Sequence, residues 1–266
     1  MTQSQIISIL EKYKIKPLQS LSQNFFIDSQ LLQKILNKIN LPANSSILEI
    51  GPGLGSLTEL LVQTQLPVIA IELDKTFAKI LPKILNNPAN LIVHHQDILK
   101  SQNIIDEIKP PYTVIANIPY HITGAIIRLL VDRANPAQSI NLLIQKEVAQ
   151  NILSQDQTLF KLSVNIYADV KLLSNIPKEC FYPQPKVDSS FIQLIPHTKY
   201  SQYPREEIIQ LAKFAFQQKR KKLSTSLKPK LTKTIGEYSH NIQELLSLRP
   251  ENLTIDNWIE LYQGLK

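Results

Sequence analysis

Apolar and polar residues follow a helical period at the start of the chain. Residues 28–40 open with Asp28, a suitable N-cap, and then place apolar side chains three and four positions apart. The residues on this apolar face are Leu31, Leu32, Ile35, Leu36 and Ile39. The spacing predicts an amphipathic helix with one buried face.

Short apolar runs separated by helical segments predict five buried strands further along the chain. These runs are Ser46–Ile50, Val68–Leu73, Leu91–Asp97, Tyr112–Tyr120 and Ile140–Lys146. Helical spacing returns in 56–64, 75–85 and 124–133, and we expect Pro82 to bend or break the second of these helices. This alternation predicts an α/β fold with a doubly wound, mostly parallel sheet. Such sheets bind ligands beyond the carboxyl ends of their strands.

The pattern changes near residue 197, where we place a domain boundary. Prolines at 177, 183, 185 and 196 predict extended and turn segments before it. From Pro204 onward the sequence is helical and basic. We therefore expect a large domain over 1–197 and a small α-helical domain over 198–266.

The charge distribution favours a polyanionic partner for the second of these domains. The chain has a net charge of +7, and residues 196–266 carry 12 lysines and arginines against 7 acidic residues. Such clustering is typical of an appended nucleic-acid-binding segment. Cys180 is the single cysteine, which excludes an internal disulfide and a cysteine-based metal site. No apolar run approaches the roughly 20 residues that span a bilayer, and no signal peptide is evident, so we expect a cytoplasmic protein without a membrane partner.

A glycine-rich loop follows the first predicted strand and opens a helix. Three of the six glycines lie there, at Gly51, Gly53 and Gly55. Glycines let the backbone turn sharply and approach a ligand closely. The alternatives are an ordinary strand-to-helix turn and a nicotinamide dinucleotide site, but the dinucleotide fingerprint needs a third glycine where Ser56 stands.

Acidic residues end the next two strands. A carboxylate at Glu72 could accept both hydroxyls of a ribose, and Asp97 could accept a hydrogen bond from an adenine amino group. Each acid alone is more often a solvated strand end. Together with the glycine loop they indicate a nucleoside pocket, and S-adenosylmethionine fits because it has no phosphate that requires a lysine.

The segment Asn117-Ile118-Pro119-Tyr120 follows the residues YTVIA in the fourth predicted run and carries the candidate chemistry. An exocyclic adenine amine is a poor nucleophile because its lone pair is conjugated into the ring. The Asn117 side-chain oxygen and the Ile118 carbonyl could each accept one N6 hydrogen, and Tyr120 could stack on the base. As a bare tetrapeptide this segment would usually be a turn; after the glycine loop and two acid-ended strands, it indicates N6 methylation.

These and other motifs make the chain similar to the ribosomal RNA adenine N6,N6-dimethyltransferase family over almost its whole length. The matching segments are SQNFFID (22–28), LEIGPGLGSLTE (48–59), IELD (71–74), QDIL (96–99), NIPY (117–120), QKEVA (145–149), FYPQPKVDSS (181–190), AFQQKRKK (215–222) and RPENLT (249–254). The resemblance implies a Rossmann-like methyltransferase domain that uses S-adenosylmethionine. It also implies N6 dimethylation of two adjacent adenosines in the 3′-terminal hairpin of small-subunit ribosomal RNA, with a role in small-subunit biogenesis.

The resemblance also assigns roles by position. Asn24 and Phe26 would close over the cofactor, Gly51 would meet its methionine portion, and Asn117 would both position the cofactor and take part in catalysis. Phe181 would form the second aromatic wall of the target-base slot, although a core aromatic is the alternative. Three places depart from the family pattern, Ser22, Asn151 and Phe160-Lys161.

A dense basic stretch near the start of the second domain is the candidate RNA-binding surface. The residues expected to contact RNA are Lys213, Lys219, Arg220, Lys221 and Lys222, and the stretch continues with Lys228, Lys230 and Lys233. Lysine contacts to phosphate would position the RNA without reading its sequence and would weaken steeply with salt. A solvated surface is the alternative. The histidines at 94, 95 and 121 show no metal-ligand spacing, so we expect no metal site.

Two other functions remain open from the sequence. One is a large-subunit ribosomal RNA adenine methyltransferase that confers antibiotic resistance, which NIPYH and HQDIL resemble, whereas QKEVA and RPENLT resemble the small-subunit branch. The other is a ribosome-assembly or transcription factor derived from the same fold. We expect a monomeric enzyme that acts on immature small subunits.

Overall fold

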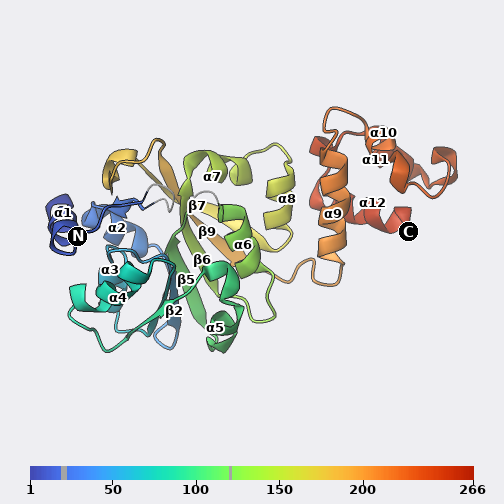
Figure 1. Ribbon diagram of the computed structural model, residues 1–266. Coiled ribbons are helices and arrows are strands. Elements are labelled where there is room, and N and C mark those ends of the chain that lie inside the picture. Colours follow the sequence, from blue (N-terminus) through green and yellow to red (C-terminus); the bar gives the residue numbers. More distant parts are fainter. Residues whose placement is uncertain (19–22, 120–121) are drawn as a thin grey trace. The chain divides into compact units, whose positions relative to one another are not determined.

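A computed structural model describes residues 1–18, 23–119 and 122–266. The chain divides into two compact units (Figure 1). The first comprises residues 1–149 and 170–196, and the second comprises 150–169 and 197–266. The second unit therefore includes a segment that the sequence placed in the large domain. The functional roles of the two domains stay predictions.

A seven-stranded sheet forms the middle of the first unit, in the order β4-β3-β2-β5-β6-β9-β7. The strands are β2 (Ser46–Ile50), β3 (Val68–Glu72), β4 (Leu91–His95), β5 (Tyr112–Asn117), β6 (Ser139–Gln145), β7 (Ala168–Ile176) and β9 (Ser189–Pro196). Strands β4, β3, β2, β5 and β6 are parallel, and β9 is antiparallel to β6. The predicted α/β Rossmann-like fold is confirmed.

Helices cover both faces of this sheet (Figure 1). Helices α2 (Ser29–Leu36), α3 (Thr58–Val62) and α4 (Lys75–Ile84) lie on one side, and α5 (Gln102–Glu107) and α6 (Thr123–Val131) on the other. Asp28 caps α2 as expected, because its side chain accepts a hydrogen bond from the Leu31 nitrogen. Pro82 lies inside α4 and does not break it; the helix ends two residues later.

Apolar side chains from alternate strand positions form the core beneath α2 and α3. Ile47, Val68 and Ile115 pack there against residues of both helices. Because successive side chains on a strand point to opposite faces, Glu49 lies on the same face of β2 as Ile47. One charged residue in this strand therefore points to the apolar side of the sheet.

The N-terminal segment adds a second, smaller sheet to the first unit. Strand β1 (Phe25–Phe26) pairs antiparallel with β8 (Phe181–Tyr182), and helix α1 (Gln3–Lys12) precedes it. Among the described residues, this unit also contains the 3₁₀ turns η2 (Ile98–Lys100) and η4 (Lys178–Cys180). Pairing of β1 with β8 brings the SQNFFID and FYPQPKVDSS segments together.

The second unit is helical. Its elements are α8 (Leu159–Asn165), α9 (Arg205–Phe216), α10 (Leu223–Ser226), η5 (Lys228–Lys230), η6 (Ile235–Glu237), α11 (His240–Ser247), η7 (Pro250–Asn252) and α12 (Ile255–Leu265). Helix α7 (Lys146–Leu153) follows β6 and ends within this unit. Helix α8 packs against α9, which explains why residues 150–169 belong with the C-terminal helices. No helix in the described ranges is long and apolar enough to cross a membrane.

Candidate active site

The glycine loop adopts the backbone conformation for which glycine is needed. Gly51, Gly53 and Gly55 have φ angles of +67°, +56° and +91°, a region that L side chains rarely occupy. The Gly51 nitrogen donates to the Ile71 carbonyl oxygen at 2.9 Å, which fixes the start of the loop beside β3. A Cβ atom on Gly51 would lie 3.4 Å from the main-chain oxygen of Asn117. The loop therefore passes close to the end of β5.

Glu72 ties the glycine loop to the end of β3. Its Oε2 accepts a hydrogen bond from the Gly53 nitrogen at 2.9 Å, and its Oε1 accepts one from the Asp74 nitrogen at 2.8 Å. Burial raises the pKa of this carboxyl, and the two main-chain N–H groups oppose the shift. Each carboxylate oxygen keeps a second lone pair, so Glu72 can still accept hydrogen bonds from a ligand that enters the cleft.

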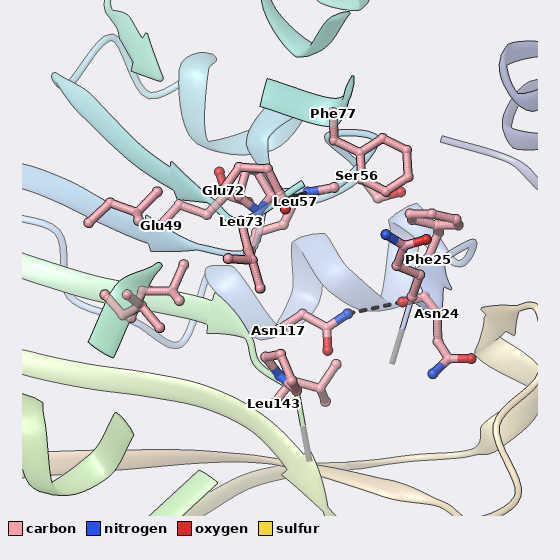
Figure 2. A pocket seen from close by; sticks show the side chains of 18 of the residues that line it. Asn24, Phe25, Glu49, Ser56, Leu57, Glu72, Leu73, Phe77, Asn117 and Leu143 are labelled. Carbon is pink, nitrogen blue, oxygen red and sulfur yellow. Dashed lines mark hydrogen bonds between the residues drawn. The ribbon is translucent and has the colours of Figure 1, made fainter. Parts of the chain in front are cut away.

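A cleft lies at the carboxyl ends of the parallel strands (Figure 2). Asp97, just after β4, lines it, and its Oδ1 accepts a hydrogen bond from the Leu99 nitrogen at 3.0 Å. Glu72, Gly51 and Gly53 line the same cleft. The structure therefore brings together the three strand-end features that the sequence singled out separately.

Asn117 is the last residue of β5 and also lines this cleft. Its Nδ2 donates a hydrogen bond to the Asn24 carbonyl oxygen at 3.1 Å, drawn as a dashed line in Figure 2. This bond fixes which end of the amide is the nitrogen and leaves Oδ1 as an acceptor. Pro119 lines the cleft as well, whereas the Ile118 side chain is buried. Tyr120 lies outside the described residues.

The N-terminal segment forms one wall of the cleft. Asn24, Phe25 and Phe26 line it, and a Cβ atom on Gly53 would lie 3.1 Å from Cε1 of Phe25. Phe77 of α4 meets Phe25 edge to face with ring centroids 5.7 Å apart and lines the cleft too. Asn24 and Phe26 thus lie where the sequence expected cofactor contacts, while the contributions of Phe25 and Phe77 were not foreseen.

Phe181 is not among the described residues that line this cleft. It was expected to form the target-base slot together with Tyr120, which lies outside the described residues, so its role as an aromatic wall stays a prediction. Its ring is 2% exposed and meets Phe26 edge to face at a centroid distance of 5.0 Å. It belongs to the core cluster that also contains Ile176 and Phe191. Strand β8 pairs with β1 so that Phe181 lies opposite Phe26, which accounts for the contact between the two rings.

Glu49 is a cleft residue to which sequence analysis gave no role. It lines the cleft, is 1% exposed, and neither carboxylate oxygen has a hydrogen-bond partner among the described residues. Burial raises its pKa to about 8; the nearby Thr58 hydroxyl opposes the shift, and repulsion from Glu72 adds to it. A charged residue inside the apolar run SILEI was the signal that could have identified it.

The residue types in the cleft suit a nucleoside that carries a positive charge. Its described lining includes three carboxylates, Glu49, Glu72 and Asp97, and contains no lysine, arginine or histidine. Such a lining disfavours a phosphate and can neutralise a cation. The orphaned Glu49 carboxyl and the space left by the absent Cβ of Gly51 both fit S-adenosylmethionine. Within the described ranges, no group of three or more histidine, cysteine or acidic side chains is arranged to hold a metal ion.

The basic stretch lies in the second unit. Lys213 is on α9, and Lys219 to Lys222 follow the end of that helix. All five basic side chains (Lys213, Lys219, Arg220, Lys221 and Lys222) are exposed. Their exposure leaves them available to a polyanion and equally permits a purely solvated surface.

Comparison with known proteins identifies the family. The family model for ribosomal RNA adenine dimethylase matches residues 15–265. A protein of Alkaliphilus oremlandii named Ribosomal RNA small subunit methyltransferase A is 36% identical over 273 residues, covering 97% of this chain and 94% of its own length. A protein of the same name from Oceanobacillus iheyensis is 37% identical over 243 residues, covering 85% and 81%.

Two solved structures share the fold. A dimethyladenosine transferase from Plasmodium falciparum has a TM-score of 0.74 at 24% identity, covering 89% of this chain and 95% of its own. The 23S rRNA methyltransferase ErmE has a TM-score of 0.70 at 22% identity, covering 91% and 99%. At these identities the likeness shows the fold alone. The family model and the sequence relatives, however, show that this chain belongs to the ribosomal RNA adenine dimethylase family, a family of S-adenosylmethionine-dependent methyltransferases.

Proposed function

We propose that this enzyme dimethylates the N6 amines of two adjacent adenosines in the 3′-terminal hairpin of small-subunit ribosomal RNA and so contributes to small-subunit biogenesis. The observation that carries the proposal is the position of Asn117. Asn117 ends β5 and lines the same cleft as Gly51, Glu72 and Asp97. Its amide nitrogen donates a hydrogen bond to the Asn24 carbonyl oxygen, which holds the side chain in place. A neutral acceptor beside a nucleoside pocket suits a weakly nucleophilic amine.

The geometry of the cleft supports an assignment of roles to the residues around the cofactor. Main-chain groups of Gly51 and Gly53 let the methionine portion approach closely, because neither residue presents a Cβ atom. The Glu72 carboxylate, already oriented by two main-chain N–H groups, accepts the ribose hydroxyls. Asp97 receives the adenine amino group, and Asn24 and Phe26 close the cleft from β1. S-adenosylmethionine supplies an activated methyl group when bound.

Asn117 and Ile118 position the amine that receives this methyl group. The Asn117 Oδ1 and the Ile118 carbonyl oxygen each accept one N6 hydrogen. Both hydrogen bonds favour a pyramidal nitrogen whose lone pair points along the line of transfer. Transfer of the methyl group would break its bond to the cofactor's sulfur, which keeps the electron pair as a neutral thioether. The methylated nitrogen then loses one proton to water, so no side chain needs to act as a general base. Good alignment of this kind contributes on the order of 7–11 kcal/mol to lowering a barrier.

Aromatic side chains hold the target adenine in this proposal. Tyr120 stacks on the adenine in this proposal, and Pro119 contributes the adjacent cleft wall. Phe181, which packs against Phe26 of β1, forms the opposite aromatic wall in this proposal. Stacking contributes roughly 1–3 kcal/mol per base and offsets much of the cost of extruding the adenosine.

The exposed basic residues of the second unit bind the RNA backbone in this proposal. Lys213 and Lys219 to Lys222 neutralise phosphates and release counterions, so affinity falls as the salt concentration rises. The immature small subunit is then the partner, the enzyme acts as a monomer, and the cytoplasm is its compartment. The relatives named as small-subunit methyltransferases favour this substrate over the large subunit.

A methylation map of both ribosomal RNAs tests the substrate. Immature small subunits and large subunits are incubated separately with the enzyme and labelled S-adenosylmethionine, and the modified positions are mapped by primer extension. We expect two adjacent N6,N6-dimethyladenosines near the 3′ end of the small-subunit RNA. Label confined to the large subunit would support the resistance-type alternative, and absence of label with intact cofactor binding would support an assembly factor.

A further inference from the structure

Glu49 presents a carboxyl group that is buried in the cleft without a partner. It is 1% exposed, and neither of its oxygens accepts a hydrogen bond from a described residue. An ionised carboxylate is among the most costly groups to bury in this way unless a cation or several donors neutralise it. A cationic ligand in the cleft would supply the partner that this side chain needs.

The surroundings of Glu49 supply polar groups but no positive charge. On β3, Glu72 is a second carboxyl that repels it. The hydroxyls of Ser56 and Thr58 are buried, and that of Thr58 is near enough to oppose the shift in the Glu49 pKa, but neither carries a charge. Strand β5 contributes the neutral Asn117. Glu59 of α3 points elsewhere and pairs with the N-terminal amine. In the ligand-free protein, burial keeps the Glu49 pKa near 8, so the carboxyl is mostly protonated at pH 7.

We propose that Glu49 is the counter-charge for a cationic group of the cofactor, and that cofactor binding at neutral pH releases the Glu49 proton to solvent. The inference rests on the proposed cofactor site and assigns it one further residue. The cofactor has two cationic groups, the α-ammonium and the sulfonium, and either can supply the charge. The proton leaves the carboxyl oxygen for buffer, and no covalent bond to the cofactor forms.

The coupling makes cofactor affinity depend on pH in a definite direction. Because the bound state holds one proton fewer, affinity rises with pH until Glu49 is already ionised in the free protein. The ligand's own α-amino group has a pKa of about 7.7–8.0, so the useful window lies below it. Between pH 6.0 and 7.0 we expect the wild-type Kd to fall by a factor approaching 10.

Isothermal titration calorimetry counts the released proton directly. Binding of S-adenosylmethionine is measured at pH 7.0 in buffers of different ionisation enthalpy, for wild type, Glu49→Gln and Glu107→Gln. Glu107 is an exposed carboxylate at the end of α5 and serves as the matched control. Wild type and Glu107→Gln should release close to one proton more than Glu49→Gln. Equal release by wild type and Glu49→Gln would overturn the proposal.

A second ligand identifies the cation. S-adenosylhomocysteine keeps the ammonium and lacks the sulfonium charge. Release that persists with S-adenosylhomocysteine assigns the ammonium as the partner of Glu49, and release seen with S-adenosylmethionine alone assigns the sulfonium. Either result supports a cationic partner.

Two controls separate the possible failures. If wild type binds no S-adenosylmethionine, the cofactor site itself is wrong; if it binds without extra proton release, Glu49 alone is wrongly assigned. Circular dichroism shows whether Glu49→Gln folds. Should this variant not fold, the wild-type Kd at pH 6.0 and 7.0 decides, because an unchanged Kd contradicts the coupling.

Discussion

At the scale of single residues, the orientation of Asn117 depends on one hydrogen bond from its Nδ2 to the Asn24 carbonyl. Asn117→Ala removes both this bond and the proposed acceptor for the target amine. Loss of one pre-aimed polar group lowers kcat by roughly 10²–10³-fold in comparable sites. We expect at least that loss in a single-turnover methylation assay, with RNA affinity unchanged.

Asn103→Ala is the matched control for this experiment, because Asn103 is an exposed asparagine on α5, outside the cleft. It should retain wild-type kcat. Normal turnover by Asn117→Ala would exclude the positioning role proposed for its side chain.

The glycine loop is a second feature at this scale, and an added Cβ atom would meet its closest contact at Gly55. Gly55 has a φ of +91°, and a Cβ atom there would lie 2.6 Å from Cδ1 of Leu81. Gly55→Ala therefore combines backbone strain with overpacking, and we expect a loss of about 2 kcal/mol in the free energy of unfolding. Gly236→Ala is the control, since no described atom lies within 4 Å of its Cβ position. Urea denaturation measures both; equal stabilities would refute the steric argument.

At the scale of elements, sequence pattern predicted most strands and helices because their apolar residues repeat at periods of 2 and 3.6. Strand β5 was predicted to reach Tyr120 but ends at Asn117. Pro119 explains part of this, because proline has no main-chain N–H to continue a strand ladder. The interior of an element is set by local periodicity, whereas its end depends on a few hydrogen bonds that the pattern does not encode.

The last residue of the RPENLT segment, Thr254, caps the N-terminus of α12. Thr254 Oγ1 accepts a hydrogen bond from the Asn257 nitrogen at 3.2 Å, and Asn257 Oδ1 accepts one from the Thr254 nitrogen at 3.1 Å. Thr254→Ala should cost about 1 kcal/mol of stability, measured by urea denaturation. Ser239→Ala is its control, because Ser239 precedes α11 without a side-chain capping bond to the described residues. A similar cost for both variants would contradict the capping role.

At the scale of the whole molecule, the residues at the strand ends of the cleft could be predicted from the sequence, whereas contacts between distant segments could not. Gly51, Glu72, Asp97 and Asn117 were found because each lies at the end of a strand or just after it, and parallel strands bring their carboxyl ends together. The pairing of β1 with β8 and the inclusion of residues 150–169 in the second unit were missed. Both depend on packing between segments far apart in the chain, which local periodicity does not report.

The proposed division of labour between the two units predicts how salt affects RNA binding. Reversal of two charges, Arg220→Glu with Lys221→Glu, should weaken binding to the small-subunit RNA and flatten its dependence on salt. The slope of log K against log salt should fall in magnitude by about 1 for each phosphate that the variant no longer neutralises. Lys83→Glu with Lys109→Glu makes the same charge change at exposed positions of the first unit. Filter binding at several salt concentrations compares the two; identical slopes would place the RNA elsewhere.

The buried carboxyl of Glu49 also makes the stability of the ligand-free protein depend on pH. Its pKa is about 8 in the folded protein and about 4.5 when exposed, so between these values the folded state holds a proton that the unfolded state has lost. The free energy of unfolding therefore falls as pH rises through this window and levels off above pH 8. From pH 5.5 to 8.5 the contribution of Glu49 amounts to about 3 kcal/mol.

Burial also raises the pKa of Glu72, which adds a slope of the same sign. Because Glu49→Gln retains Glu72, the difference between wild type and this variant isolates Glu49. Urea denaturation across this pH range should show wild type losing stability relative to Glu49→Gln as pH rises, and saturating S-adenosylmethionine should reduce the difference. Parallel stability curves for the two proteins would show that Glu49 titrates as an ordinary carboxyl.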